Sequence, residues 1–319
     1  MSRLAVMAHW DPRGQVAPHV RRQVASLAAA VDELVVVSTA DLDDDGAAFL
    51  GRHGRLLRRT NYGYDFFSYK TGLEASRPED FDEVVVCNDT YVPLVGYGEV
   101  FEAMAGRPAD FWGLTASQRV HPHVQSFFVA FRPWLVGSQA FRGFWGRMSP
   151  VSDRASVIAE YEVGLSRTLT DGGFRFASYY TETDADRALA QRRVAWWTLH
   201  RLPPPRRRRE WEFLKARSKD PWNPAIALAD VALAPSPPRP AGARLPYLKI
   251  DTLRYDPYGL GAERLLRLAE RRRPEELAGV REYLAATAPL SAARPDTDLR
   301  PTPVGVRPLR RLVEYGRAA

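Results

Sequence analysis

Three short apolar runs, each ending in polar residues, constrain the fold of this chain more than any other feature. They are RLAVMAH at 3–9, ELVVVST at 33–39 and EVVVCN at 83–88. Runs of this kind are typical of buried strands, and intervening segments such as VAPHVRRQVASLAAAV at 16–31 have helical periodicity. This alternation predicts an α/β fold, with a mainly parallel sheet that is flanked by helices.

The pattern changes after residue 110. DFWGLT and HVQSFFVAF predict two longer strands, followed by a helix through 154–173 and a closing strand FRFASYYT. PPPRRRR then marks a boundary, because its prolines forbid regular structure and its arginines repel one another. We expect four segments: an α/β domain at 1–200, a basic linker at 201–210, a mostly helical region at 211–288 and a Pro/Arg-rich tail at 289–319.

Composition restricts the compartment and the partners. There is one cysteine, Cys87, and no signal-peptide pattern or long apolar run, so we expect a cytoplasmic protein that at most rests on the inner face of a membrane. The net charge of +7 comes almost entirely from arginine and favours contact with phosphates. Zinc-finger and RNP-type patterns are absent from the sequence, and we expect no nucleic-acid partner.

Polar side chains follow each buried run, and in a parallel sheet these positions meet at one edge, where ligands bind. His9 and Asp11 follow the first run in HWDPRG, which replaces the glycine-rich turn of a dinucleotide site. DPRG itself is typical of a β-turn. Asp11 is therefore either a turn residue or a ligand-binding carboxylate, and His9 beside it is a candidate for substrate binding.

The stretch RTNYGYD at 59–65 lies where a strand would lead into a helix. Asp65 is well placed as a helix N-cap, and the free N–H groups of a helix start also attract anions. Capping does not account for Arg59 and Asn61, whose side chains can bind a phosphate or a ribose. We therefore predict that Arg59, Asn61 and Asp65 contribute to a substrate site.

Asn88, Asp89 and Thr90 end the third run. An Asx turn accounts for them simply. The alternative is a carboxylate that holds a divalent cation against a diphosphate, since Mg²⁺ sites commonly combine one or two carboxylates with substrate phosphate oxygens. Only one carboxylate is present here, which leaves the cation open.

Two further segments carry candidate chemistry. RVHPHVQ contains Arg119, His121 and His123, which predict a polar substrate wall because two histidines do not complete a zinc site. In the helix at 154–173 the apolar stripe is formed by Val157, Tyr161, Leu165 and Leu169. Glu160 and Glu162 lie off this stripe, so they are either solvated or available as a general base.

Six stretches in order resemble the rhamnan-synthesis (RgpF-like) family of glycosyltransferases. They are AHWDPRGQVAPHV, NYGYDFFSYKTGL, VVVCNDTYVPL, DFWGLTAS, HVQSFFVAFRP and YEVGLSRTLTDGGF. The resemblance covers about residues 3–176 and continues more faintly in LPYLKIDTLRYDPYG. It implies a GT-A-like, nucleotide-sugar-binding sheet and a small, mostly helical C-terminal region.

The resemblance also implies roles for single residues. Glu162 matches the base of inverting GT-A enzymes, since Leu165 and Gly173 have the expected spacing after it. Asp89 takes the place of the donor-positioning acid, while Tyr64 and Lys70 fall in a matching stretch and are expected at the substrate. The usual Asp-x-Asp reads Asn88-Asp89-Thr90, so departure of the diphosphate is assisted either by Mg²⁺ or Mn²⁺ on Asp89 or by arginines 59 and 119 without a metal.

The implied activity is inverting transfer of a deoxyhexose, L-rhamnose from dTDP-rhamnose, to a growing cell-surface polysaccharide or O-antigen-type glycan. The expected partners are the nucleotide-sugar donor, a glycan or lipid-linked acceptor, and a membrane surface contacted peripherally. The alternative is a non-catalytic sugar-nucleotide or glycan-binding assembly protein on the same fold.

Overall fold

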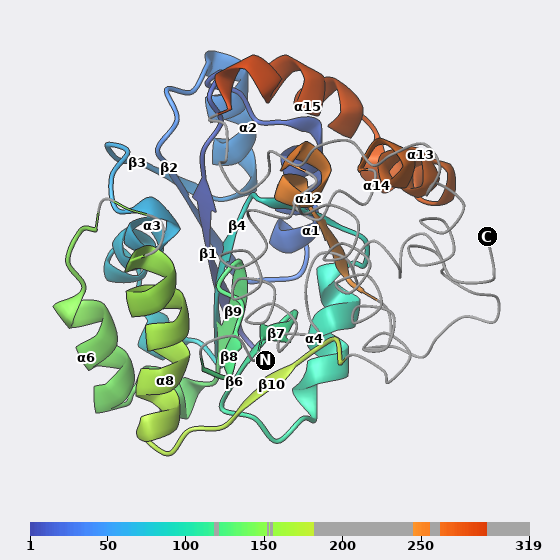
Figure 1. Cartoon of the computed structure of the whole chain (residues 1–319). Coiled ribbons are helices and arrows are strands. Elements are labelled where there is room, and N and C mark those ends of the chain that lie inside the picture. Colours follow the sequence, from blue (N-terminus) through green and yellow to red (C-terminus); the bar gives the residue numbers. More distant parts are fainter. Residues whose placement is uncertain (118–120, 152, 154–155, 182–244, 256–261, 292–319) are drawn as a thin grey trace, which may run out of the picture. The chain divides into compact units, whose positions relative to one another are not determined.

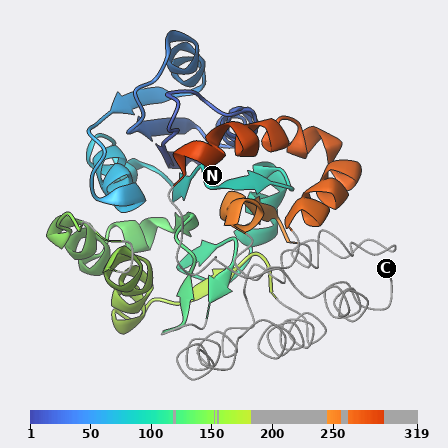
Figure 2. The same cartoon turned by 45° about the horizontal axis from the view of Figure 1, so that its top comes forward.

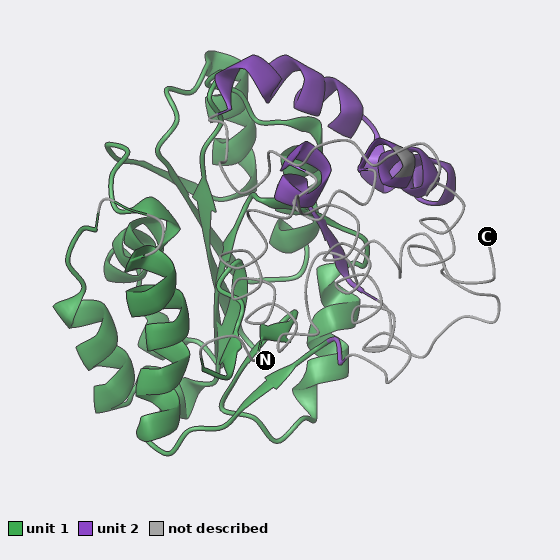
Figure 3. Ribbon diagram, in the orientation of Figure 1, with its two compact units in different colours: residues 1–179 green, residues 180–319 purple. Residues whose placement is uncertain are grey.

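The chain forms two compact units, residues 1–179 and 180–319 (Figure 3). The computed structural model describes residues 1–117, 121–151, 153, 156–181, 245–255 and 262–291. The predicted linker at 201–210 and most of the predicted tail lie outside the described residues. The division into four segments therefore stays a prediction.

The first unit is built on a seven-stranded sheet of order β10-β6-β9-β4-β1-β2-β3. Its strands are β1 (Arg3–His9), β2 (Glu33–Ser38), β3 (Arg55–Arg58), β4 (Glu83–Asn88), β6 (Phe111–Gly113), β9 (Phe128–Phe131) and β10 (Phe176–Ser178). Strand β9 runs antiparallel to β4 and β6, whereas the other paired strands are parallel. The predicted mixed, mainly parallel sheet is confirmed.

Helices cover both faces of this sheet. They are α1 (Pro18–Ala28), α2 (Asp44–His53), α3 (Tyr64–Glu74), α4 (Tyr97–Ala105), α5 (Pro133–Val136), α6 (Gln139–Arg147) and α8 (Gly164–Asp171). Helices α3, α6 and α8 lie on one face, and α1 and α4 on the other (Figures 1 and 2). On the first face Gly72 lets α3 approach β1 closely, because a Cβ there would lie 2.2 Å from Cγ1 of Val6.

The region after β4 departs from the prediction in detail. Instead of two longer strands it contains the short strands β5 (Tyr91–Pro93), β6, β7 (Ala116–Ser117), β8 (His123–Val124) and β9. The predicted strand HVQSFFVAF is interrupted because the chain turns, with Phe128 N–H donating to the carbonyl of Gln125. The predicted helix through 154–173 is a π-helix at Val157–Val163 followed by α8.

The second unit is mostly helical in its described part, as the sequence predicts. It contains β11 (Tyr247–Lys249), α12 (Ile250–Tyr255), α13 (Ala262–Arg272), α14 (Pro274–Leu277) and α15 (Val280–Thr287). Arg281 of α15 binds Glu263 at 2.8 Å and Glu270 at 2.7 Å, which fixes α15 to α13. Among the described helices none is long and apolar enough to cross a bilayer.

A buried carboxylate joins the strands of the first unit where they begin. Glu83 of β4, which is 1% exposed, accepts from Arg3 Nε at 2.9 Å, Arg132 Nη1 at 2.9 Å and Trp112 Nε1 at 3.0 Å. These partners belong to β1, to the end of β9 and to β6. A buried carboxylate is tolerated only when paired in this way.

We expect Glu83→Gln to destabilise the first unit by about 3–5 kcal/mol, because it leaves the buried Arg132 without a compensating charge. The free energy of unfolding measured with urea tests this. Glu102→Gln, on the exposed side of α4, is the matched control and should change stability by less than about 0.5 kcal/mol. Equal, small losses in the two variants would contradict the role given to Glu83.

Candidate active site

The carboxyl ends of β1 and β4 meet at the point where the strand order of the sheet reverses (Figure 1). β1 pairs with β4 on one side and with β2 on the other, so the chain leaves these strands in opposite directions. Ligands of open α/β sheets bind at such a point. A hydrogen bond links the two loops there, as Trp10 N–H donates to Oδ2 of Asp89 at 2.7 Å.

Two of the predicted substrate residues after β1, His9 and Asp11, are buried. His9 is 2% exposed, its Nδ1 lies 3.0 Å from Ser38 Oγ, and burial lowers the pKa of the ring to about 4 despite the nearby charge of Asp11. The Asp11 carbonyl accepts from Gly14 N–H at 3.2 Å, which confirms the predicted β-turn. His9 is therefore a neutral, buried ring, and substrate binding by His9 and Asp11 stays a prediction.

The Asn88 side chain shapes the loop after β4. Its Oδ1 accepts from Thr90 N–H at 3.2 Å and from Thr90 Oγ1 at 2.7 Å, which is the predicted Asx turn. Its Nδ2 donates to Oδ2 of Asp65 at 2.6 Å, and its carbonyl accepts from Gln23 at 2.8 Å. These contacts account for Asn88 and Thr90 structurally and leave Asp89 as the carboxylate that the turn presents.

The predicted N-cap at Asp65 is wrong. Helix α3 begins at Tyr64 with Gly63 as its N-cap, in the left-handed conformation at φ 67°. Asp65 lies in the first turn and is bound by Asn88 instead. Tyr64 also has a positive φ of 55°, which is uncommon for a tyrosine, and its side chain is 43% exposed.

Arg59 holds the loop that precedes α3. Its Nε and Nη2 donate to Ser68 Oγ at 3.1 and 2.9 Å, and its two terminal nitrogens donate to the carbonyls of Thr60, Tyr62 and Tyr64 at 2.7–2.9 Å. A guanidinium has five N–H groups, and these contacts use all of them. Phosphate binding by Arg59 would require this loop to open, and it stays a prediction.

The remaining predicted substrate residues lie apart from one another. Asn61 is exposed in the same loop. Lys70 Nζ donates to the carbonyl of Trp145 at 2.8 Å and lies 3.5 Å from Glu74, so it stabilises the end of α6. Arg119 lies outside the described residues.

Glu162 is held by the segment that contains the two histidines. Ser126 donates its N–H at 3.1 Å and its hydroxyl at 2.5 Å to Oε2, and His123 Nε2 lies 3.8 Å from Oε1. His123 Nδ1 lies 2.7 Å from the carbonyl of His121. Because a carbonyl only accepts, Nδ1 carries a proton and Nε2 is directed to the carboxylate. Glu160, in contrast, is exposed.

Tyr69 is buried and contacts the segment that holds Glu162. Its hydroxyl donates to the carbonyl of Ser126 at 3.1 Å. Burial raises the pKa of Tyr69 well above its ordinary value, and the charges of Asp65, Asp89 and Glu162 add to the increase. Both predicted catalytic carboxylates thus contribute to the electrostatic environment of one buried phenol.

The environments of the two carboxylates shift their pKa values in opposite directions. Burial raises the pKa of Asp89 to about 8, against the hydrogen bond from Trp10, and the charges of Asp65 and Asp11 add to the increase. Burial also raises the pKa of Glu162, but the interaction with His123 and the hydrogen bonds from Ser126 outweigh it and leave this pKa below its ordinary value. At neutral pH Glu162 is thus ionised, while Asp89 is largely protonated.

Asp89 fits a divalent cation only as part of a shared site. Within the described ranges, no group of three or more His, Cys, Asp and Glu side chains is placed to hold a metal ion. One carboxylate completed by phosphate oxygens of a donor is nevertheless a common Mg²⁺ arrangement. The raised pKa of Asp89 is consistent with it, since a cation there would favour the ionised form.

Sequence reasoning missed four residues of this site: Trp10, Gln23, Tyr69 and Ser126. Trp10 could have been found, because it follows β1 at the ligand-binding edge. The other three act through contacts between segments far apart in the chain, for which the sequence carries no local signal.

The pKa of Asp89 predicts a pH-dependent stability. An unfolded Asp ionises near pH 4, but the folded carboxyl keeps its proton until about pH 8, so this group destabilises the fold increasingly as pH rises between these values. In thermal melts, Asp89→Asn should therefore gain stability over the wild type from about pH 5 to about pH 9.

Asp82→Asn is the matched control, because the pKa of Asp82 is shifted in the opposite direction from that of Asp89. Hydrogen bonds from Ser2 lower the pKa of Asp82, so the stability that it contributes is present above about pH 4 and is lost only below it. This variant should be less stable than the wild type by a constant amount over the same pH series. A constant difference for Asp89→Asn as well would refute the raised pKa.

Known proteins resemble parts of this chain. The virulence protein VirA of Vibrio anguillarum is 29% identical over 125 residues, which are 37% of this chain and 40% of that protein. An uncharacterized protein of Sinorhizobium fredii, y4gN, is 22% identical over 193 residues, 58% of this chain and 50% of that protein. The matches thus span half or less of these relatives.

Solved structures of nucleotide-using enzymes resemble it more distantly. A nucleotidyl transferase from Methanothermobacter has a TM-score of 0.35 at 13% identity, over 56% of this chain and 86% of that one. Glucosyl-3-phosphoglycerate synthase from Mycobacterium tuberculosis, in complex with Mn²⁺ and UDP, has a TM-score of 0.31 at 15% identity, over 42% and 57%. Scores this low establish no correspondence between sites.

The family model described as rhamnan synthesis protein F matches residues 34–198. This range is more than half of the 319 residues, and it includes both Asp89 and Glu162. The chain belongs to the rhamnan synthesis protein F family.

Proposed function

We propose that this protein is an inverting, GT-A-like glycosyltransferase that moves L-rhamnose from dTDP-rhamnose onto a growing cell-surface polysaccharide or O-antigen-type glycan. Family membership supports the sugar and the product class. The observation that carries the proposal is that the charges of Asp89 and Glu162 both act on the buried phenol of Tyr69, while Asp89 follows β4 beside the reversal of strand order. The acceptor is lipid-linked, and the protein works at the inner face of the membrane.

Glu162 is the base in this proposal. A sugar hydroxyl is a poor nucleophile near neutral pH, so a carboxylate must accept its proton during attack on the anomeric carbon. Glu162 is ionised, and Ser126 occupies Oε2, which leaves Oε1 beside His123 for the incoming proton. His123 positions the carboxylate and, when its ring bears both protons, stabilises its charge.

Asp89 serves the leaving group. The departing nucleoside diphosphate gathers negative charge, which a cation or oriented N–H groups must neutralise. All N–H groups of Arg59 are used by its own loop and by Ser68 of α3, which favours the cation over Arg59 for this role. Asp89 would hold that cation together with donor phosphate oxygens, and the cation would supply the neutralising charge.

Exposed aromatic side chains at this edge suit the planar parts of the donor. Trp10, Tyr62 and Tyr64 are 48%, 50% and 43% exposed, although rings of this size are usually buried. The positive φ of Tyr64 indicates a conformation that its surroundings enforce. We assign these rings to packing against the base or the sugar.

Donor binding is the first test. Saturating dTDP-L-rhamnose at ~100 times its dissociation constant should stabilise the protein by about 2.7 kcal/mol in thermal-shift assays with Mg²⁺. The shift should shrink with EDTA and in Asp89→Asn, but not in Asp82→Asn. Stabilisation by UDP-glucose alone would contradict the sugar assignment, and a full Mg²⁺-dependent shift in Asp89→Asn would contradict the role of Asp89.

Transfer is the second test. Glu162→Gln should bind the donor like the wild type but release dTDP about 10²–10⁴-fold more slowly in the presence of acceptor, because the base is lost. Glu160→Gln, two residues away and exposed, should match the wild type in both assays. Wild-type turnover by Glu162→Gln would eliminate this mechanism. Donor binding without turnover in the wild type itself would favour the non-catalytic assembly protein.

A further inference from the structure

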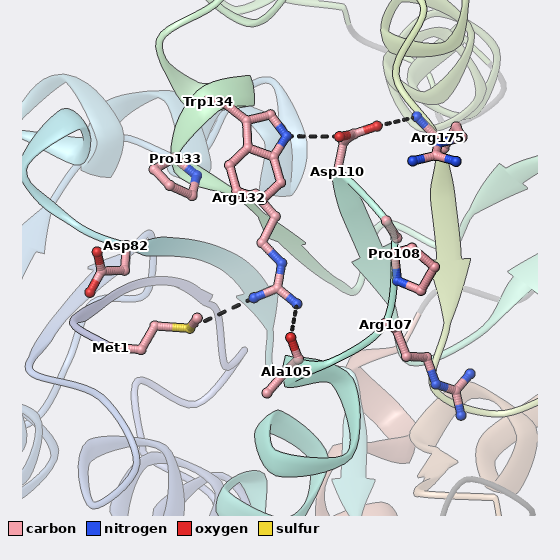
Figure 4. Close-up of a pocket in the computed structure, with 11 residues that line it drawn as sticks. Met1, Asp82, Ala105, Arg107, Pro108, Asp110, Arg132, Pro133, Trp134 and Arg175 are labelled. Atoms are coloured by element: carbon pink, nitrogen blue, oxygen red, sulfur yellow. Dashed lines mark hydrogen bonds between the residues drawn. The ribbon is translucent and has the colours of Figure 1, made fainter.

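A concave surface lies near the amino-terminal ends of β1, β4, β6 and β10, opposite to the strand ends that carry the candidate active site (Figure 4). It is a cavity of about 430 Å³ within the first unit. Its walls are mainly apolar or aromatic, and its charged side chains are Arg107, Arg132, Arg175, Asp82 and Asp110. None of these residues belongs to the site described above.

Trp134 is the prominent side chain of this cavity. It is 59% exposed, yet its Nε1 donates to Oδ1 of Asp110 at 2.7 Å. The other oxygen of Asp110 accepts from Arg175 N–H at 2.6 Å, so the carboxylate that orients the indole is itself fixed (Figure 4). The ring is thus held in one orientation, and its exposed part is an apolar face.

The floor of the cavity is rigid as well. Arg132 is 4% exposed, and it binds Glu83 at 2.9 Å and the carbonyl of Met104 at 2.7 Å. The cavity therefore rests on the same buried network that joins the strands. A site built on fixed side chains loses little entropy when it binds a ligand.

The hydrogen-bonding capacity that remains consists mainly of donors. The exposed guanidinium of Arg175 makes no hydrogen bond or ion pair with a described residue, and Arg107 uses one nitrogen on the carbonyl of Ser178 at 3.0 Å. Asp82 and Asp110 already accept hydrogen bonds. A ligand with hydroxyl or acidic oxygens beside an apolar face would match this arrangement.

We propose that this cavity binds a pyranose ring of a glycan, with the apolar face of the sugar on Trp134 and its oxygens at Arg175 and Arg107. The indole N–H of Trp134 is occupied by Asp110, so the ring contributes its apolar surface, and the guanidinium groups contribute the hydrogen bonds to the sugar. The inference does not depend on the chemistry at the other edge. It gives the protein a second sugar site, far along the strands from Asp89.

Fluorine NMR of the full chain labelled with 5-fluorotryptophan tests the proposal. The Trp134 signal is assigned by its loss in Trp134→Phe. Titration with methyl α-L-rhamnopyranoside and with D-glucuronic acid, each to ~20 mM, should shift this signal saturably, because this concentration saturates a site with a dissociation constant of about 1 mM, or about −4.1 kcal/mol. An unchanged Trp134 signal with both sugars would overturn the proposal, as would a shift confined to the Trp10 signal.

Arg175→Ala tests the contribution of the guanidinium group separately from that of the Trp134 ring. It should weaken binding of D-glucuronic acid at least about tenfold, which is 1.4 kcal/mol, and weaken binding of the neutral glycoside less. Equal affinities in the variant and the wild type would overturn the role of Arg175. Trp134→Phe should keep the thermal shift produced by dTDP-L-rhamnose, so loss of that shift would show that the two edges are not separate sites.

Discussion

The paired carboxylate of Glu83 is the interaction on which the rest of the first unit depends. It lies opposite Arg3 in the register of β1 and β4, and the same register brings Ala8 opposite Asn88 at the other end. A slip by one residue would turn every side chain of β4 to the other face and would bury Asp89 away from Trp10. The ion pairs of Glu83 at the start of β4 thus also help to position the candidate site at the end of β1 and β4.

The sequence was sufficient for the parallel part of the sheet and for the strand ends that carry the candidate site. Uninterrupted apolar runs such as ELVVVST permit little but a strand that is buried on both faces, and the alternation with helices makes neighbouring strands parallel. Because the strands are buried and parallel, His9 and Asn88 are expected at the same end of the sheet. The same pattern also identifies Asp89, because a carboxylate at the end of a buried strand must be bound, capped or protonated.

The partners of these side chains could not be predicted in the same way. Periodicity separates Glu162 from the apolar stripe, but it treats Glu160 identically, and only the contact with Ser126 distinguishes the two. The π-helix that carries both has no signature in the residues themselves. Arg59 was predicted to bind phosphate because it is a cation in a polar loop. The structure shows that backbone carbonyls of the same loop accept its N–H groups, and the sequence carries no signal for these contacts.

Under the proposed function, the opposite pKa shifts of Glu162 and Asp89 fit their different roles as base and as cation ligand. Two acids whose environments separate their pKa values are typical of sites that need one ionised and one protonated group. Glu162 is ionised before any ligand binds, whereas at neutral pH Asp89 would become largely ionised when a cation binds beside it. Below about pH 8, binding of a cation with the donor would therefore release the proton of Asp89. At Asp89, unlike at Glu162, the negative charge would therefore form together with the binding of the cation.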